Sequence, residues 1–198
     1  MRRRVAISGS AGVGKTTLAR RLAGRLDLPY LEEGMRRRLE AGLNLHALTR
    51  DAMRALLVEL WDEREAEEDA AVARHGGFVS DRCAVDWAAF YLYYGFTNPE
   101  DATGPFLDRM RARASAAYDL VVVLPWGALP LQHDGVRSTN RWKQLHFQGL
   151  LEGMLSRQLP PGVLRPLPDG LHRLEGRAAW VHAALSRQAR SPGPPPGA

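Results

Sequence analysis

The 198-residue sequence contains a single cysteine, only two lysines and no long apolar run. One cysteine, Cys83, cannot form a disulfide within the chain, which fits a reducing compartment. No segment approaches the roughly 20 apolar residues that a membrane-spanning helix needs, and the apolar stretch near the start is too short for a signal peptide. The six histidines show no metal-ligand spacing. We therefore expect a cytoplasmic protein with no membrane partner and no zinc site.

Arginine supplies almost all of the positive charge, and the formal net charge is +5. The arginines are scattered rather than gathered in one run, so charge alone does not indicate nucleic acid binding. The only lysines are Lys15 and Lys143. Lys15 lies in a glycine-rich loop, where a slender ammonium fits beneath a phosphate chain and a broad guanidinium does not. The arginine bias itself fits a GC-rich genome.

Short apolar runs alternate with helical patterns along the whole chain, and no repeat is visible. The runs predict strands at residues 4–8, 28–34, 78–82, 118–125 and 170–176. Apolar periodicity and capping residues predict helices at residues 15–26, 49–75, 83–96, 98–118, 141–158 and 177–189. This alternation predicts an α/β fold, a three-layer sandwich in which a parallel sheet of about five strands has helices on both faces. Residues 1–190 are predicted to form one domain, and the Pro- and Gly-rich residues 191–198 a disordered tail.

The segment GSAGVGKT, residues 9–16, matches the pattern G-x-x-x-x-G-K-[ST] between a predicted strand and a predicted helix. Glycines let backbone N–H groups turn around a phosphate without Cβ clashes, and the helix N-terminus adds partial positive charge. Lys15 is then expected to reach the β- and γ-phosphates, and the Thr16 hydroxyl to ligate Mg²⁺. The pattern therefore predicts a P-loop NTPase sandwich that uses ATP and Mg²⁺, with ATP or GTP left open. The predicted nucleotide-binding residues of the loop are Gly9, Ser10, Ala11, Gly12, Val13, Gly14, Lys15, Thr16 and Thr17.

The predicted strand 78–82 ends in Asp81 and Arg82. Ligands gather at the carboxyl ends of strands in open α/β sheets, so Asp81 is expected to hold Mg²⁺ with Thr16 or to accept a proton from an attacking hydroxyl. A hydrolytic P-loop ATPase usually carries glutamate after this aspartate to polarise water. Arginine suits a transferring or acceptor phosphate better, and the sequence therefore favours phosphoryl transfer. The alternatives are a capping role for Asp81 and a surface ion pair for Arg82.

The segment SDRCAVDWAAFY, residues 80–91, resembles the Asp-Arg-x-x-x-Asp segment of a P-loop kinase-like family grouped with AAA-type ATPases. That family includes the nicotinamide riboside kinase domain of a bifunctional NAD-biosynthesis regulator and is similar to other nucleoside and nucleotide kinases. Residues 31–42 are similar to the Glu-x-x-Arg element of the family, and residues 118–140 to its Tyr-Asp strand and Asp-Gly-x-Arg lid. The resemblance covers residues 3–185 and implies phosphoryl transfer without naming an acceptor. Leu131 and Gln132 stand where the lid is expected to be more acidic.

The family resemblance also implies roles for residues outside the phosphate loop. Glu33 is expected to orient or deprotonate the acceptor, although a solvated helix start is an equal alternative, and Asp81 remains a second candidate for the base. Arg137 and Arg141, in a lid loop near residues 126–141, are expected to neutralise charge and exclude water; ordinary surface arginines are the alternative. Arg177 is expected to stack on the base of the nucleotide.

The predicted helix after Arg82 carries two further candidates. Asp86 lies one helical turn after Arg82 and is expected to face the same mouth, where it would bind a sugar or a base. The aromatic residues of this helix are interpreted either as a stacking wall for a ring or, more commonly for such a stripe, as core. They are Trp87, Phe90, Tyr91 and Tyr94.

The sequence thus predicts an ATP- and Mg²⁺-dependent kinase whose partners are a nucleoside triphosphate and a small-molecule acceptor, such as a nucleoside or a nucleotide. A polynucleotide kinase and a non-catalytic ATP-binding switch are the alternatives, and nucleic acid is the less favoured acceptor. The sequence leaves open whether the protein forms a homodimer.

Overall fold

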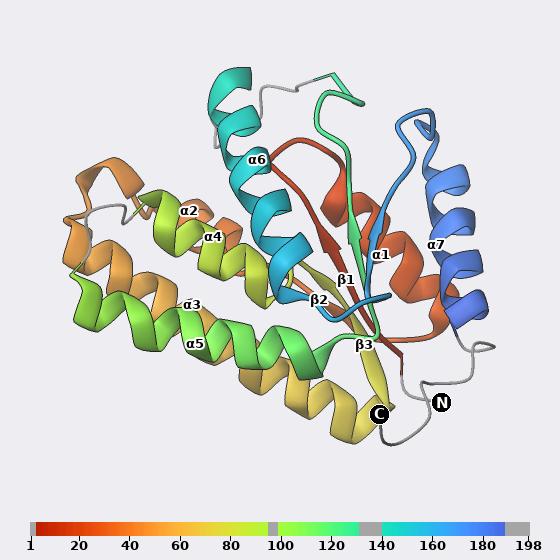
Figure 1. Cartoon of the computed structure of the whole chain (residues 1–198), viewed down its shortest axis with the longest axis horizontal. Helices are drawn as coiled ribbons and strands as arrows, with labels where there is room; N and C mark the ends of the chain where they lie inside the picture. Colours follow the sequence, from red (N-terminus) through yellow and green to blue (C-terminus); the bar gives the residue numbers. More distant parts are fainter. Residues whose placement is uncertain (1–2, 95–98, 131–139, 189–198) are drawn as a thin grey trace.

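A five-stranded parallel sheet lies between two layers of helices in the computed structural model (Figure 1). The structure describes residues 3–94, 99–130 and 140–188; Arg137 and the predicted tail lie outside this part. The strands are β1 (Arg3–Ser8), β2 (Tyr30–Leu31), β3 (Gly77–Asp81), β4 (Leu120–Val123) and β5 (Leu164–Pro166). Their order across the sheet is β2-β3-β1-β4-β5, and every pair is parallel. This arrangement confirms the predicted α/β sandwich.

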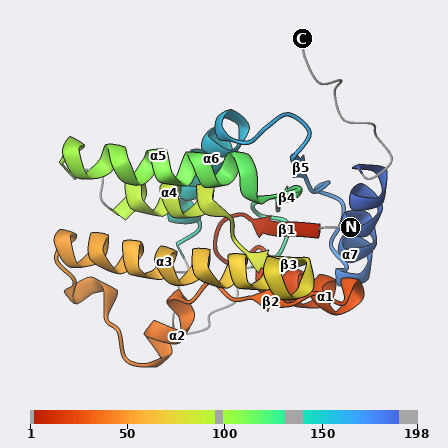
Figure 2. The ribbon, with the colours of Figure 1, turned by 90° about the horizontal axis from the view of Figure 1, so that it is seen from below.

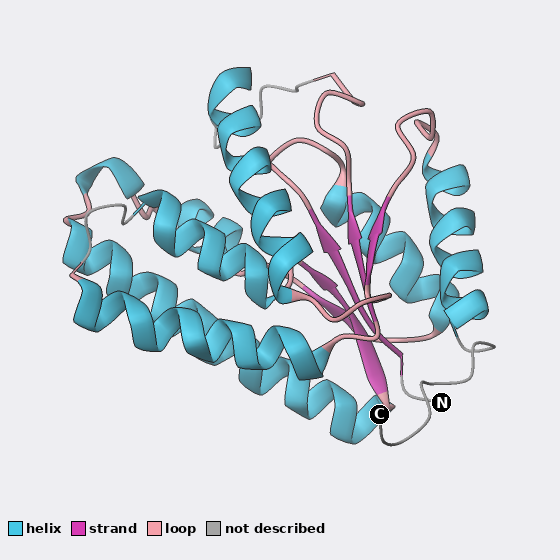
Figure 3. Cartoon of the chain, viewed as in Figure 1, coloured by secondary structure: helices cyan, strands magenta, loops and turns pink. Residues whose placement is uncertain are grey.

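The helices separate into two layers, as Figures 2 and 3 show. They are α1 (Lys15–Leu26), α2 (Met35–Glu40), α3 (Arg50–His75), α4 (Ala84–Tyr94), α5 (Glu100–Ala117), α6 (Arg141–Gln158) and α7 (Leu174–Gln188), with a 3₁₀ turn at Leu45–Ala47. Helices α1 and α7 cover one face of the sheet, and α3 to α6 cover the other. The Thr49 hydroxyl accepts a hydrogen bond from the N–H of Ala52 and caps α3, as its position predicted.

Alternating side chains of the central strands supply both layers of the core. Val5 and Ile7 of β1 pack toward α1 and α7, while Ala6 between them packs toward the helices of the opposite face. The continuous apolar run of β4 is buried on both faces, as expected for an inner parallel strand. In the part of the chain that is described, no helix is long and apolar enough to cross a membrane.

The last strand and the second strand differ from the prediction. The predicted strand at residues 170–176 is wrong: β5 is Leu164–Pro166, and α7 already begins at Leu174. Pro166 and its neighbouring prolines hid this strand, because proline disfavours an inner strand and is tolerated at the edge of a sheet, where β5 lies. Strand β2 has only two residues, fewer than the predicted range 28–34. Both strands lie at the edges, so the site at the centre of the sheet is unaffected.

Candidate active site

The phosphate loop connects the carboxyl end of β1 to the N-terminus of α1, as predicted. Gly9 and Gly14 have φ angles of 136° and 90°, which side chains of L-residues rarely adopt. A Cβ at Gly9 would lie 3.2 Å from the carbonyl oxygen of Leu124, and one at Gly14 would lie 3.0 Å from Leu129 Cδ1. Glycine is therefore required at both positions by backbone conformation and by close neighbours.

Lys15 is buried inside this loop, and its Nζ donates a hydrogen bond of 2.7 Å to the carbonyl oxygen of Ser10. Burial, and after it the positive charge of Arg82, lower the pKa of Lys15 to about 8, although the carboxylates of Asp81, Glu33 and Asp86 act in the opposite direction. The ammonium is thus poorly compensated in the protein alone. A phosphate chain in the loop would supply the missing negative charge.

Thr16 and Asp81 meet at the carboxyl ends of the central strands. The Thr16 hydroxyl donates a hydrogen bond to Asp81 Oδ2, and the other oxygen, Oδ1, is buried without a hydrogen-bond partner among the described residues. Register places Asp81 opposite Ile7, beside the start of the phosphate loop. A hydroxyl and a carboxylate with a spare oxygen are ligands that Mg²⁺ prefers. The residues present therefore fit the predicted metal.

Arg82 follows Asp81 and adopts a φ of 79°, in the left-handed region that non-glycine residues seldom occupy. Its Nε donates to Glu33 Oε1 at 2.6 Å, and its Nη1 donates to Asp86 Oδ1 at 3.0 Å and to the carbonyl oxygen of Gly9 at 3.1 Å. The guanidinium also lies 4.4 Å from the ring centroid of Phe90. Arg82 is thus held rigidly against the phosphate loop and is not a surface residue.

The charge of Arg82 is kept by its neighbours. Burial alone would lower the pKa of Arg82, but the carboxylates of Glu33, Asp86 and Asp81 raise it above its ordinary value. A permanent cation therefore stands beside the loop that is expected to bind phosphates. Glu33 is the partner of Arg82 and is not a solvated helix start, which the sequence left as an equal alternative.

Asp86 does not face the mouth of the site, so that expectation is wrong. Its side chain is 0% exposed, and its Oδ2 accepts hydrogen bonds from the Ser8 hydroxyl at 2.8 Å and from the Cys83 N–H at 3.0 Å. Asp86 instead ties the first turn of α4 to β1 and to Arg82. The spacing of one helical turn was recognised in the sequence, but the direction of the side chain depends on how α4 packs.

The aromatic residues of α4 are mainly core. Trp87 and Tyr91 are buried, and Phe90 stacks on Phe147 of α6 with centroids 4.7 Å apart. Only Tyr94 is substantially exposed, at 43%. The structure therefore favours the core interpretation for most of this stripe.

Gln148 of α6 is a residue of the site that the sequence did not reveal. It is buried, its Oε1 accepts the N–H of Ser10 at 2.7 Å, and its Nε2 donates to the carbonyl oxygen of Leu124 at 3.0 Å. These bonds join the phosphate loop to the end of β4 and to α6. Helical periodicity predicted α6 correctly, but a glutamine on a helix gives no indication that it will meet a loop about 140 residues earlier.

Two further predicted arginines, Arg177 and Arg141, have different surroundings: Arg177 contacts the phosphate loop, and Arg141 lies against tryptophan rings. Arg177 is buried, its Nη1 donates to the carbonyl oxygen of Val13 at 2.9 Å, and its Nη2 has no partner among the described residues. The guanidinium of Arg141 stacks on the rings of Trp126 and Trp142, with centroid distances of 5.4 and 4.8 Å. A contact of Arg177 with a base and of Arg141 with phosphates both stay predictions.

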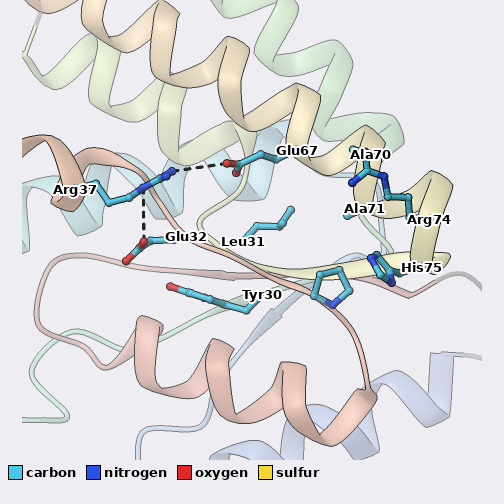
Figure 4. Close-up of a pocket in the computed structure, with 10 residues that line it drawn as sticks. Tyr30, Leu31, Glu32, Arg37, Glu67, Ala70, Ala71, Arg74 and His75 are labelled. Atoms are coloured by element: carbon cyan, nitrogen blue, oxygen red, sulfur yellow. Dashed lines mark ion pairs between the residues drawn. The ribbon is translucent and has the colours of Figure 1, made fainter.

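The arginines of α2 are paired with carboxylates. Arg36 pairs with Glu40 at 2.9 Å, and Arg38 pairs with Glu59 and Glu63 of α3 at 2.7 and 2.5 Å. Arg37 bridges Glu32 and Glu67, each at 3.7 Å, across one end of a groove of about 390 Å³ between β2 and α3 (Figure 4). The groove is lined from residues 29–32, α2 and the second half of α3, and no residue of the phosphate loop lines it, so we do not assign it to the site.

Comparison with known proteins agrees with this geometry. The sequence profile of the AAA domain family matches residues 4–161. The chain belongs to the AAA domain family. No curated protein sequence matches it significantly.

Solved structures similar to this AAA domain chain include NadR protein and two proteins named as kinases. NadR protein in complex with NR has a TM-score of 0.71 at 22% identity; the alignment covers 96% of this chain and 52% of NadR. Thymidylate kinase from Candida albicans has a TM-score of 0.65 at 14% identity, covering 95% and 92% of the two chains. Deoxyadenosine kinase from M. mycoides has a TM-score of 0.63 at 12% identity, covering 93% and 99%. The chain thus spans about half the length of NadR, and at these identities the likeness concerns the fold.

The low pKa of Lys15 leads to a testable pH dependence in this AAA domain. Lys15 is protonated below pH 8, so the affinity for ATP is expected to fall as the pH rises through about 8, by up to about tenfold per pH unit.

The contribution of Lys15 to the stability of the protein without ligand is expected to change in the opposite direction. Between the folded pKa of about 8 and the ordinary value of 10.5, the unfolded chain binds more protons, so the contribution of Lys15 to the free energy of unfolding rises with pH.

Calorimetric titration of ATP between about pH 7 and pH 9.5 measures this affinity. The slope above pH 8 is expected to disappear in Lys15→Met, which has no group to titrate at this position. Equal slopes in the variant and in the natural protein would show that another group is responsible.

Proposed function

We propose that the protein is an ATP- and Mg²⁺-dependent phosphotransferase whose acceptor is a small molecule, such as a nucleoside, a nucleotide or a related metabolite. The observation that carries the proposal is the place of Arg82. Its guanidinium lies 3.1 Å from the Gly9 carbonyl oxygen and is held by Glu33 and Asp86. A fixed cation at this point suits a phosphoryl group in transfer, because phosphoryl transfer depends on positioning and on electrostatic stabilisation.

Each part of the site has a role in this proposal. The loop amides and Lys15 would bind the β- and γ-phosphates, and Thr16 and Asp81 would hold Mg²⁺. When bound, Mg²⁺ neutralises phosphate charge and orients the triphosphate. The acceptor hydroxyl oxygen forms a bond to the γ-phosphorus while the bond from that phosphorus to the β–γ bridging oxygen breaks, and ADP leaves. The hydroxyl proton passes to a carboxylate, for which Asp81 and Glu33 are the two candidates.

Arg82 is the electrostatic group of this mechanism, and its contacts restrict its motion. Because Glu33 and Asp86 hold two of its nitrogens, the guanidinium needs little reorganisation as charge develops on the transferring group. Arg137 and Arg141 of the expected lid are proposed to neutralise further charge, and Arg177 to contact the nucleotide base. The fold similarity to thymidylate kinase and deoxyadenosine kinase supports a nucleoside or nucleotide acceptor.

Consumption of ATP with Mg²⁺ across a panel of acceptors tests the proposal. The panel contains nucleosides, nucleotides, amino sugars and oligonucleotides, with a blank that lacks an acceptor and with Lys15→Met as the inactive control. We expect a small acceptor to raise turnover well above the blank and the phosphorylated acceptor to appear in equal amount to ADP. Turnover only with oligonucleotides would indicate a polynucleotide kinase. Tight ATP binding without acceptor-dependent turnover would contradict the kinase and favour a nucleotide switch.

A further inference from the structure

The turn that carries Arg82 is strained and is held by several hydrogen bonds. A φ of 79° at a non-glycine residue costs on the order of 1 kcal/mol, so the surrounding structure must maintain it. The N–H of Arg82 donates to the carbonyl oxygen of Ile7 at 2.9 Å, and the Ser80 hydroxyl donates to the carbonyl oxygen of Arg82 at 2.8 Å. These two bonds attach the turn to β1 and to the end of β3.

The other side of the turn is the start of α4, where a distant residue takes part. The N–H of Ala84, the first residue of α4, donates to the hydroxyl oxygen of Tyr118 at 2.9 Å. Tyr118 lies between α5 and β4 and is 4% exposed, and its ring meets Phe78 of β3 edge to face at 6.2 Å. A tyrosine hydroxyl thus replaces the usual side-chain cap for this N–H group.

Glu68 of α3 sets the direction of the Tyr118 hydroxyl. The hydroxyl donates to Glu68 Oε1 at 2.9 Å, while Glu68 Oε2 accepts from Arg113 Nε at 3.1 Å and from Arg113 Nη2 at 2.9 Å. Glu68 is 0% exposed. Because the hydroxyl proton is directed at Glu68, the lone pairs of the oxygen remain for Ala84. Burial also raises the pKa of Tyr118 well above its ordinary value, which keeps the hydroxyl protonated.

We propose that Tyr118 and Glu68 are positioning residues for Arg82 in phosphoryl transfer. They fix the first turn of α4; Asp86 on that turn holds Arg82 Nη1, and Arg82 in turn lies against Gly9. In the described part of the chain neither residue is hydrogen-bonded to the phosphate loop, so their effect passes through the first turn of α4. This inference rests on the proposed function for its kinetic consequence, but the placement of Arg82 can be measured without any turnover.

The decisive variant is Tyr118→Phe, which removes one oxygen atom and leaves the ring. Hydrogen exchange of the Arg82 Nε–H, followed by NMR in the protein without ligand, reports its bond to Glu33. We expect exchange to be at least tenfold faster in Tyr118→Phe than in the natural protein. The matched control is Tyr91→Phe on α4, whose hydroxyl makes one long bond of 3.4 Å, to the Ala102 carbonyl oxygen, among the described residues. The exchange rate in this control is expected to be unchanged. An unchanged rate in folded Tyr118→Phe would overturn the inference.

Glu68 supplies a second pair of variants in case the loss of the Tyr118 hydroxyl prevents folding. Glu68→Gln keeps an oxygen that accepts from Tyr118, and exchange is expected to stay within about threefold of the natural rate. Glu68→Leu leaves the hydroxyl without its acceptor, and exchange is expected to accelerate as in Tyr118→Phe. Equal rates in the two Glu68 variants would contradict a role for the direction of the hydroxyl.

Kinetic measurements then test whether the position of Arg82 affects the rate of phosphoryl transfer. In Tyr118→Phe we expect kcat for the best acceptor to fall about tenfold while the affinity for ATP changes less than twofold. In an Arg82→Ala background the same substitution is expected to cause no further loss, because it acts through Arg82. A full additional loss in that background would overturn the inference. If no acceptor is found, the proposed function fails, and the exchange measurement still decides the placement of Arg82.

Discussion

Replacement of Lys15 by methionine is expected to abolish phosphoryl transfer and, at the same time, to stabilise the protein without ligand. The catalytic loss is expected to reach about 10³-fold in kcat, because a fixed cation aimed at the transferring phosphate is removed. Stability is expected to rise because the ammonium is buried and its pKa is lowered to about 8. A lowering of the pKa by this amount corresponds to a gain of about 3 kcal/mol in the free energy of unfolding at neutral pH when the ammonium is removed. The loss of the hydrogen bond to Ser10 reduces this gain by about 1 kcal/mol. An increase of about 4 °C in Tm follows for a chain of this length.

Steady-state turnover and thermal melting of the same preparation check both halves of this expectation. The matched control is Lys143→Met, which removes the only other lysine, an exposed residue of α6. The control is expected to keep the turnover and the Tm of the natural protein. Undiminished turnover in Lys15→Met would overturn the assignment of the phosphate loop, and a lower Tm would contradict the cost of the buried ammonium.

The substitution Asp81→Asn is expected to reduce kcat by about 10³-fold while the affinity for ATP changes by less than about threefold. The amide keeps an oxygen and the shape of the side chain, but it lacks the negative charge that the metal requires. Loop amides and Lys15 still bind the triphosphate, so binding is largely preserved. Two observations support this expectation: Asp81 Oδ1 has no hydrogen-bond partner among the described residues, and Asp81 Oδ2 accepts a hydrogen bond from the Thr16 hydroxyl.

Titration of Mg²⁺ at saturating ATP and acceptor separates metal binding from other effects of this variant. The Mg²⁺ concentration for half-maximal turnover is expected to rise at least about tenfold in Asp81→Asn. Asp108→Asn, on the exposed face of α5, changes the net charge equally and serves as the control. An unchanged Mg²⁺ requirement with reduced kcat would instead assign Asp81 as the base and leave the metal to other groups.

The ion pairs of α2 bear on the polynucleotide alternative. Arg36, Arg37 and Arg38 form a basic run in the sequence, but each pairs with at least one glutamate. Their charge is therefore largely compensated before any ligand arrives. These three arginines are weak support for a basic track along which a nucleic acid would bind, which agrees with the preference for a small acceptor.

Much of this protein was predictable from the sequence, because its strongest features are local. The phosphate loop depends on glycines at fixed spacing between a buried strand and a helix, and both neighbours lie within a few residues. Helix α3 was predicted to within one residue, because Thr49 caps its start and Gly76 ends it. The parallel sheet followed from the alternation of strands and helices. Asp81 and Arg82 were predicted as candidate site residues because the end of an inner strand is where ligands gather in this type of fold.

Only the tertiary structure decided how these parts are held together. Asp86 turns inward to Ser8, Gln148 reaches the phosphate loop from α6, and Tyr118 caps α4. None of these contacts has a sequence pattern, because each depends on the packing of elements between about 30 and 140 residues apart. β5 was missed because prolines are excluded from inner strands but tolerated at an edge, and its position is known only once the sheet is assembled. Local spacing thus predicted which groups are proposed to carry the chemistry, and packing determined which buried residues hold them in place.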